Sequence, residues 1–186
     1  MTDNPVYIPA DAARPHGTVF STGGFHNSRA PAGIDGVAFA WADLCQLAQR
    51  HVDKLFQHPS TAALLADEFT YKPLHMVANG WAEEARALAQ PTLISLGAFG
   101  QNDVPSQALP AWRKATAIGQ CLDSSLAVLA VLASLAMTAG RHPVPPALAG
   151  LVAQVDDCVP TSGEVRRLGL ELETLAMRFS PYGSGR

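Results

Sequence analysis

The stretch LAVLAVLASLAM, residues 126–137, decides the fold of this 186-residue chain. Wound as a helix it is apolar on every face, and it lies inside a longer helical pattern from about Ala111 to Thr138 that stops at Gly140. A helix of this kind is normally buried on every side. We therefore expect it to be the centre of a helical core and to need covering partners, other subunits included.

Two further long helices are predicted before it. Apolar residues recur at three- and four-residue steps from Asp35 to about Gln57 and from Lys72 to Ala89, and a proline follows shortly after each stretch. The first predicted apolar face consists of Val37, Trp41, Leu44, Leu47, Ala48, Val52, Leu55 and Phe56, and the second of Leu74, Val77, Ala78, Trp81, Ala85 and Leu88. Shorter helices are expected over 61–66, near 146–156 and over 162–179.

Two stretches lack this periodicity and are rich in proline, glycine and small polar residues. Residues 1–34 are expected to form an extended, looped entry segment with short strands at 6–8 and 18–20, and a second irregular loop is expected near 92–110. The prediction is an all-α, long-helix bundle in one domain. It consists of the entry segment 1–34, a core over 35–140, and short C-terminal helices with a tail over 141–186.

The composition narrows the function classes. Charged residues make up only 16% of the chain, whereas about 25% is usual for a soluble domain. This indicates extensive subunit contacts, although an ordinary alanine-rich domain would have the same composition. The formal net charge is −3, and the scattered Lys and Arg form no basic stripe, so nucleic-acid binding is not expected.

Cysteines and histidines give no sign of a disulfide framework or a metal site. Cys45, Cys121 and Cys158 are far apart and lack CxxC spacing, and the histidines show no HxxxH or HExxH spacing. No basic start followed by an apolar stretch marks a signal peptide, and residues 126–137 alone are too short to cross a bilayer. We expect a cytoplasmic protein that does not act at a membrane.

Three polar clusters remain: Thr2-Asp3-Asn4-Pro5, Gly23-Gly24-Phe25-His26 and Gln101-Asn102-Asp103. Taken singly, each is explained by a turn or a hydrogen-bonded loop. Taken in order with the helices between and after them, over roughly residues 2–140, they resemble the second half of the aromatic amino acid lyases. These are the histidine and phenylalanine ammonia-lyase type enzymes that carry a methylidene-imidazolone electrophile.

The resemblance implies a substrate-binding role for several positions. Asn4 matches an asparagine that helps to hold the substrate carboxylate, and Phe25 matches a phenylalanine beside the electrophile and the substrate ring. Asn102 falls near the substrate amine, with Gln101 beside it, while His26 and Asp103 are supporting neighbours. Asn102 replaces the family's Glu or Gln and cannot act as a base, and Gly24 replaces an asparagine.

The resemblance also shows what this sequence lacks. It contains no Ala-Ser-Gly, from which the family's electrophile forms, and neither the catalytic tyrosine nor the substrate-binding arginine element. We therefore expect no catalytic residue and no cofactor in this chain alone. It is expected to be a C-terminal part or subunit of an enzyme that deaminates a small aromatic or similar α-amino acid. A separate N-terminal lyase subunit would carry the methylidene-imidazolone group.

The alternative is a non-catalytic helical protein that kept the lyase fold and serves assembly or regulation. Either reading is compatible with a homo-oligomer.

Overall fold

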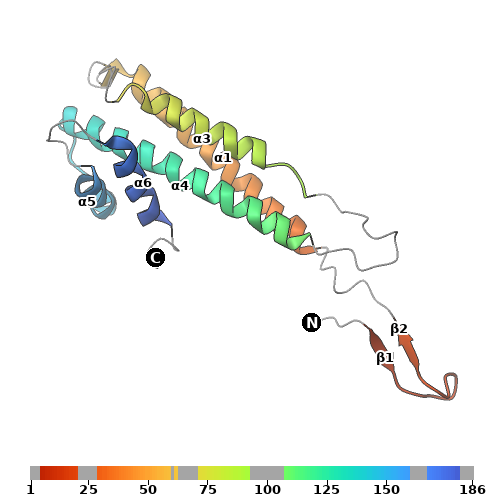
Figure 1. Ribbon diagram of the computed structural model, residues 1–186. Helices are drawn as coiled ribbons and strands as arrows, with labels where there is room; N and C mark the ends of the chain where they lie inside the picture. The colour runs from red at the N-terminus through yellow and green to blue at the C-terminus, as the bar shows by residue number, and fades with distance from the viewer. Residues whose placement is uncertain are drawn as a thin grey trace.

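The computed structural model describes residues 5–20, 29–59, 61–62, 71–92, 107–159 and 167–180. Three long helices lie side by side, α1 (Arg29–Gln57), α3 (Leu74–Leu88) and α4 (Ala108–Ala139), as Figure 1 shows. A short 3-10 turn, η3 (Pro146–Leu148), leads into α5 (Ala149–Cys158), and α6 (Leu168–Phe179) follows. Both shorter helices pack against α4. The predicted all-α, long-helix bundle is confirmed.

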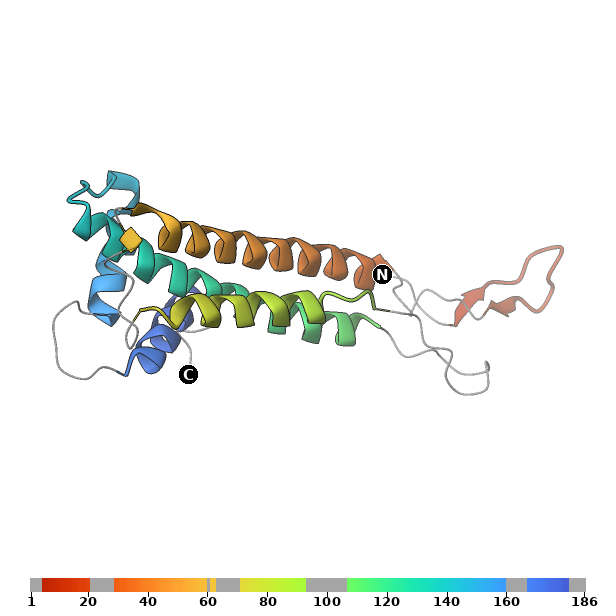
Figure 2. The same ribbon diagram turned by 90° about the horizontal axis from the view of Figure 1, so that it is seen from above.

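The helices run in alternating directions. Helices α1 and α4 begin at one end of the bundle, and α3 ends there (Figure 2). We call this end the head; α5 and α6 lie toward the opposite end, which we call the tail (Figure 1). Residues 29, 92 and 107, which border the segments 21–28 and 93–106 outside the described residues, lie at the head.

The predicted strands are confirmed. Strands β1 (Val6–Ile8) and β2 (Thr18–Phe20) form an antiparallel hairpin in which Tyr7 lies opposite Val19. Gly17 has a positive φ of 69°, and an added Cβ would lie 2.6 Å from the Tyr7 hydroxyl. Glycine is therefore required where the hairpin loop enters β2.

Helix α1 begins six residues earlier than predicted, at Arg29 instead of Asp35. Pro31 lies in its first turn, where the missing N–H has no helical partner to lose, so the proline does not delay the helix. Helix α4 likewise starts at Ala108 with Pro110 in its first turn, and it ends before Gly140 as predicted. The predicted start of each helix was therefore too late in the sequence.

The last predicted helix is shorter than expected. Helix α6 begins at Leu168, after Arg167, whereas the pattern predicted a start near 162. Residues 160–166 lie outside the described residues, as does most of the short helix predicted over 61–66, of which 61–62 are helical. Together η3 and α5 match the helix predicted near 146–156.

Two buried clusters form the core. Toward the head the cluster consists of small residues and one isoleucine: Ala38, Ala42, Cys45, Ala82, Ala85, Ala115, Ile118 and Cys121. Toward the tail it contains larger side chains that α5 and α6 help to bury, among them Val52, Leu74, Val128, Val131, Leu132, Val155, Leu172 and Leu175. The small side chains let α1, α3 and α4 approach closely at the head.

The predicted apolar face of α1 is partly wrong. Val37, Leu44 and Leu47 are 46%, 47% and 49% exposed, while Ala38, Ala42 and Cys45 face the bundle. On α3, Val77 is likewise exposed and Ala82 is buried. Hydrophobic periodicity favours large apolar residues, whereas tightly packed helices bury small ones at the contact, so the pattern selected a neighbouring face.

The predicted burial of residues 126–137 on every face holds in part, since six of the twelve residues are buried and five are half-buried. Only Leu126, at 38% exposure, counts as exposed, because α1, α3, α5 and α6 all pack on α4. Coverage of this stretch by other subunits stays a prediction. By length and composition alone α4 could cross a membrane, as the buried core helices of many soluble proteins could.

Truncating the core at Leu132, which is fully buried, should destabilise the protein. We expect Leu132→Ala to lower the free energy of unfolding by about 2–5 kcal/mol through lost burial and an unfilled cavity. The matched control is Leu109→Ala on the same helix, where the leucine is 56% exposed, and it should change stability little. Urea unfolding followed by circular dichroism measures both, and equal losses would contradict this packing.

Candidate functional site

The predicted site residues all lie outside the described residues. Asn4 belongs to 1–4, Phe25 and His26 to 21–28, and Gln101, Asn102 and Asp103 to 93–106. Their roles therefore remain predictions. The structure does describe the head of the bundle, where the last two of these segments begin or end, and a buried polar cluster lies there.

Asp35 is the centre of this cluster. It lies in the second turn of α1 and is only 6% exposed. The backbone N–H of Thr92 donates to its Oδ2 at 2.6 Å, and the Thr92 hydroxyl donates to its Oδ1 at 2.8 Å. A residue just beyond α3 is thereby bound to the side chain of α1 through both carboxylate oxygens.

Lys114 joins the same carboxylate from α4. Its Nζ lies 3.1 Å from Asp35 Oδ1, and it also donates to the backbone carbonyl of Gln90. One buried carboxylate therefore connects all three long helices at the head. We call Asp35, Gln90, Thr92 and Lys114 the Asp35 clasp.

Local sequence explains how the chain reaches Asp35. Helix α3 ends at Leu88, and the Ala89 N–H still bonds to the Ala85 carbonyl as a cap. Pro91 has no N–H to donate and pushes the residue before it out of the helical region. The chain therefore leaves α3 in a non-helical conformation, and Thr92 is free of the helix to bond across to α1.

The clasp keeps its carboxylate ionised. Burial tends to raise the pKa of Asp35, but the two hydrogen bonds from Thr92 and the ammonium group of Lys114 outweigh it and lower the pKa below the ordinary 3.8. The sequence alone did not single out Asp35, because its partner Thr92 lies 57 residues away. In the sequence, Asp35 could have been noticed only as a carboxylate that lies one turn before the alanine-rich face of α1.

All three cysteines lie in the two buried clusters of the core. All three are free and buried, and burial raises the pKa of Cys45 and of Cys121 to about 11. Their thiols are therefore protonated at neutral pH and are poor nucleophiles. Among the described residues, no group of His, Cys, Asp and Glu could hold a metal ion.

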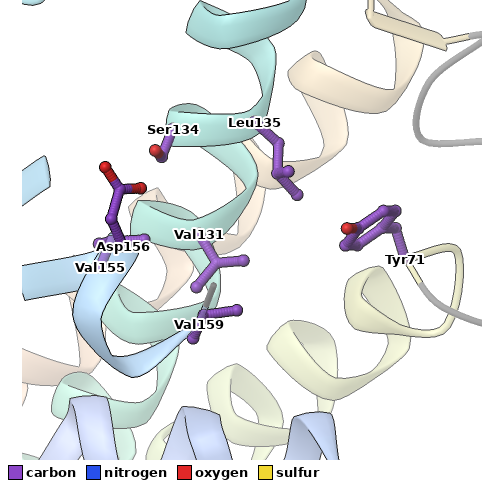
Figure 3. Close-up of a pocket in the computed structure, with 7 residues that line it drawn as sticks. All are labelled: Tyr71, Val131, Ser134, Leu135, Val155, Asp156 and Val159. Carbon is purple, nitrogen blue, oxygen red and sulfur yellow. The ribbon is translucent and has the colours of Figure 1, made fainter. Parts of the chain in front are cut away.

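A small pocket lies toward the tail, between α4, α5 and the start of α3 (Figure 3). Its lining consists of Tyr71, Val131, Ser134, Leu135, Val155, Asp156 and Val159. Figure 3 shows Ser134 and Asp156 on one side and Tyr71 on the other. The space inside is about that of one water molecule, which is too small for an amino acid.

The residues present do not fit the electrophile of the lyases. The sequence contains no Ala-Ser-Gly, and Ser134, which follows Ala133, is followed by Leu135 in the middle of α4. Ser134 is also nearly buried, at 7% exposure. This stretch is an ordinary core helix and does not contain the tripeptide from which the methylidene-imidazolone electrophile forms.

The comparisons with known proteins agree with this architecture. The family described as aromatic amino acid lyase matches residues 1–157, and the chain therefore belongs to the aromatic amino acid lyase family. The structure of Pantoea agglomerans phenylalanine aminomutase matches 95% of this chain with a TM-score of 0.71 at 21% identity, which shows a shared fold. This chain covers only 36% of the aminomutase chain. No curated protein sequence matches significantly.

The lowered pKa of Asp35 makes the clasp sensitive to acid. Its contribution to stability is fully present above the unfolded-state pKa, near 3.9, and is lost as the pH falls through the lower folded-state pKa. Asp35→Asn should cost about 2 kcal/mol at pH 7. Below about pH 4 the difference from wild type should shrink.

Urea unfolding across this pH range measures the effect. Asp43→Asn, at an exposed aspartate on the same helix, is the matched control and should alter stability little at any pH. Parallel pH profiles for wild type and Asp35→Asn would contradict the ionised clasp.

Proposed function

We propose that this chain is a C-terminal part or subunit of an ammonia-lyase-like enzyme. Its reaction would remove the amino group of an aromatic or similar α-amino acid without oxidation. The observation that carries the proposal is the family match over residues 1–157, because it spans all three polar clusters together with the helices between them. The fold shared with an aminomutase supports it.

In this proposal the chain binds and orients substrate. Asn4 would contact the substrate carboxylate, since an amide NH2 can donate to it, and Phe25 would pack beside the substrate ring. Gln101 and Asn102 would lie near the amine, supported by His26 and Asp103. Neither amide can remove a proton, so the base would come from elsewhere.

A separate N-terminal lyase subunit would supply what is missing. It would carry the methylidene-imidazolone electrophile, the tyrosine base and the arginine for the substrate carboxylate. We place the assembly in the cytoplasm, where three free cysteines stay reduced. The proposed enzyme therefore requires a partner chain that contains an Ala-Ser-Gly tripeptide.

The hairpin supports the need for a partner. Tyr7 and Val19 are 59% and 62% exposed, and Val6 and Phe20 are exposed beside them. Among the described residues, the two strands contact each other and no helix. A lone two-stranded hairpin is marginally stable in water, so another chain is expected to cover it.

A second apolar surface lies on α1. Val37, Leu44 and Leu47 are spaced by seven and three residues, so they share one face of the helix, and all three are about half exposed. An exposed apolar stripe of this kind is typical of a surface that packs against another subunit. It supports assembly into a homo-oligomer, with or without the lyase subunit.

A non-catalytic assembly or regulatory protein is the second candidate. Two positions that differ from the family pattern favour it: Gly24 stands where an asparagine is usual, and Asn102 stands where a Glu or Gln is usual. Both candidates predict an oligomer, so only turnover distinguishes them.

Turnover is tested by co-expressing this chain with a lyase-like chain that contains Ala-Ser-Gly and purifying through a tag on this chain. The complex should convert one member of an aromatic amino acid panel to an unsaturated acid, detected by ultraviolet absorbance, or to an isomeric β-amino acid, detected by chromatography. Asn4→Ala should lower kcat/KM by about 100-fold, through lost orientation of the substrate.

The matched control for Asn4→Ala is Asn79→Ala, at an exposed asparagine of α3, which should leave turnover unchanged. If the chain forms a stable homo-oligomer that binds no partner and converts no substrate, the non-catalytic assembly or regulatory function is supported instead.

The oligomer is tested on the α1 stripe. Leu44→Glu places a charge on a half-exposed apolar surface and should shift the protein to a smaller species in light scattering after size exclusion. Leu170→Glu is the matched control, because it makes the same change at a leucine of α6 that is 55% exposed. If both variants keep the wild-type mass, the stripe is no interface.

A further inference from the structure

We propose that Asp35 is a positioning residue, which fixes the end of α3 relative to the start of α4, the two helices on either side of segment 93–106. The inference rests on the proposed function, since that segment contains the predicted substrate-binding residues Gln101 and Asn102. Asp35 itself would touch no substrate. It would act through Thr92 and Lys114.

The carboxylate is suited to fixing a geometry. It is almost fully buried, its Oδ2 accepts the Thr92 N–H, and its Oδ1 receives both the Thr92 hydroxyl and Lys114 Nζ. Hydrogen bonds that involve a charged group are stronger and shorter than neutral ones. With three donors on two oxygens, the side chain has little freedom to turn.

The bonded groups lie on both sides of the segment. Thr92 is the last described residue before it, and Lys114 lies in the second turn of α4 after it. Lys114 also reaches back to the Gln90 carbonyl. The separation between the end of α3 and the start of α4 is therefore set by one carboxylate on α1, in addition to helix packing.

A merely stabilising ion pair is the alternative explanation. A buried pair often adds little net stability compared with apolar packing of the same volume, and Asp35 with Lys114 alone would have sufficed for it. Here the carboxylate also binds a backbone N–H outside any helix, at the point where the chain departs for segment 93–106. This bond fixes the path of the main chain, which stabilisation by itself does not require.

The first experiment measures the backbone directly and needs no activity. In Asp35→Asn and Asp35→Ala we expect the Thr92 amide hydrogen to exchange about tenfold faster than in wild type, because its acceptor is weakened or removed. Amides in the middle of α4, around Ile118, should keep their wild-type rates. Unchanged exchange at Thr92 in Asp35→Ala would overturn the proposal.

The second experiment measures kinetics in the complex with the lyase-like chain. Thr92→Val removes the hydroxyl that donates to Asp35 and should raise KM about tenfold with a smaller change in kcat, because a misplaced segment weakens substrate binding. Thr116→Val is the matched control, since that hydroxyl bonds to the Trp112 carbonyl within α4. Lys114→Met should resemble Thr92→Val, and Lys114→Arg should restore most of the lost affinity.

The outcomes separate the two proposals. An active wild-type complex in which Asp35→Asn and Thr92→Val keep the wild-type KM would overturn the positioning role and leave the proposed function standing. A wild-type complex that converts nothing would overturn the proposed function and the positioning role together. A raised KM in Thr92→Val, with a wild-type melting temperature, would establish positioning as distinct from stability.

Discussion

Close packing of small side chains at the head of the bundle is the constraint on which the rest of this structure depends. Alanines and cysteines of α1, α3 and α4 fill the space between the three helices there. A Cβ added at Gly119 would lie 3.2 Å from the Trp41 ring, so the glycine of α4 leaves room for this ring of α1. At this end one aspartate side chain of α1 reaches both a residue beyond α3 and a lysine of α4.

The two ends of the bundle consequently differ in kind. The tail is held by branched apolar side chains that α5 and α6 cover, and its pocket is too small for an amino acid. The head has a small-residue core and a buried, charged clasp. The described residues that border segments 21–28 and 93–106 also lie at the head.

Membership of the aromatic amino acid lyase family explains the architecture without supplying a complete active site. The family match covers residues 1–157, yet this sequence spans 36% of the aminomutase chain with which it shares a fold, and it has no Ala-Ser-Gly. The exposed hairpin and the stripe on α1 are apolar surfaces that this chain does not cover among its described residues.

Local pattern in the sequence determined the helices, the two strands and the family, because each depends on residues that lie close together in the chain or recur at a fixed period. The centres of α1, α3 and α4 and the strands at 6–8 and 18–20 follow from this. Residues Asn4, Phe25 and Asn102 were likewise found from motif order, and their placement stays a prediction. The early start of α1 was missed because residues 1–34 are rich in proline and glycine and lack helical periodicity, although Pro31 is tolerated in the first turn.

Tertiary structure alone decided which face of each helix is buried and where the clasp lies. Ala38 and Cys45 face the bundle while Val37 and Leu44 remain exposed, because helices pack most closely through small residues, and the identity of the neighbouring helix is not encoded within α1 itself. Asp35 shows the same dependence. Its three bonds come from Thr92 and Lys114, distant in sequence, and only the fold brings their donors to its carboxylate.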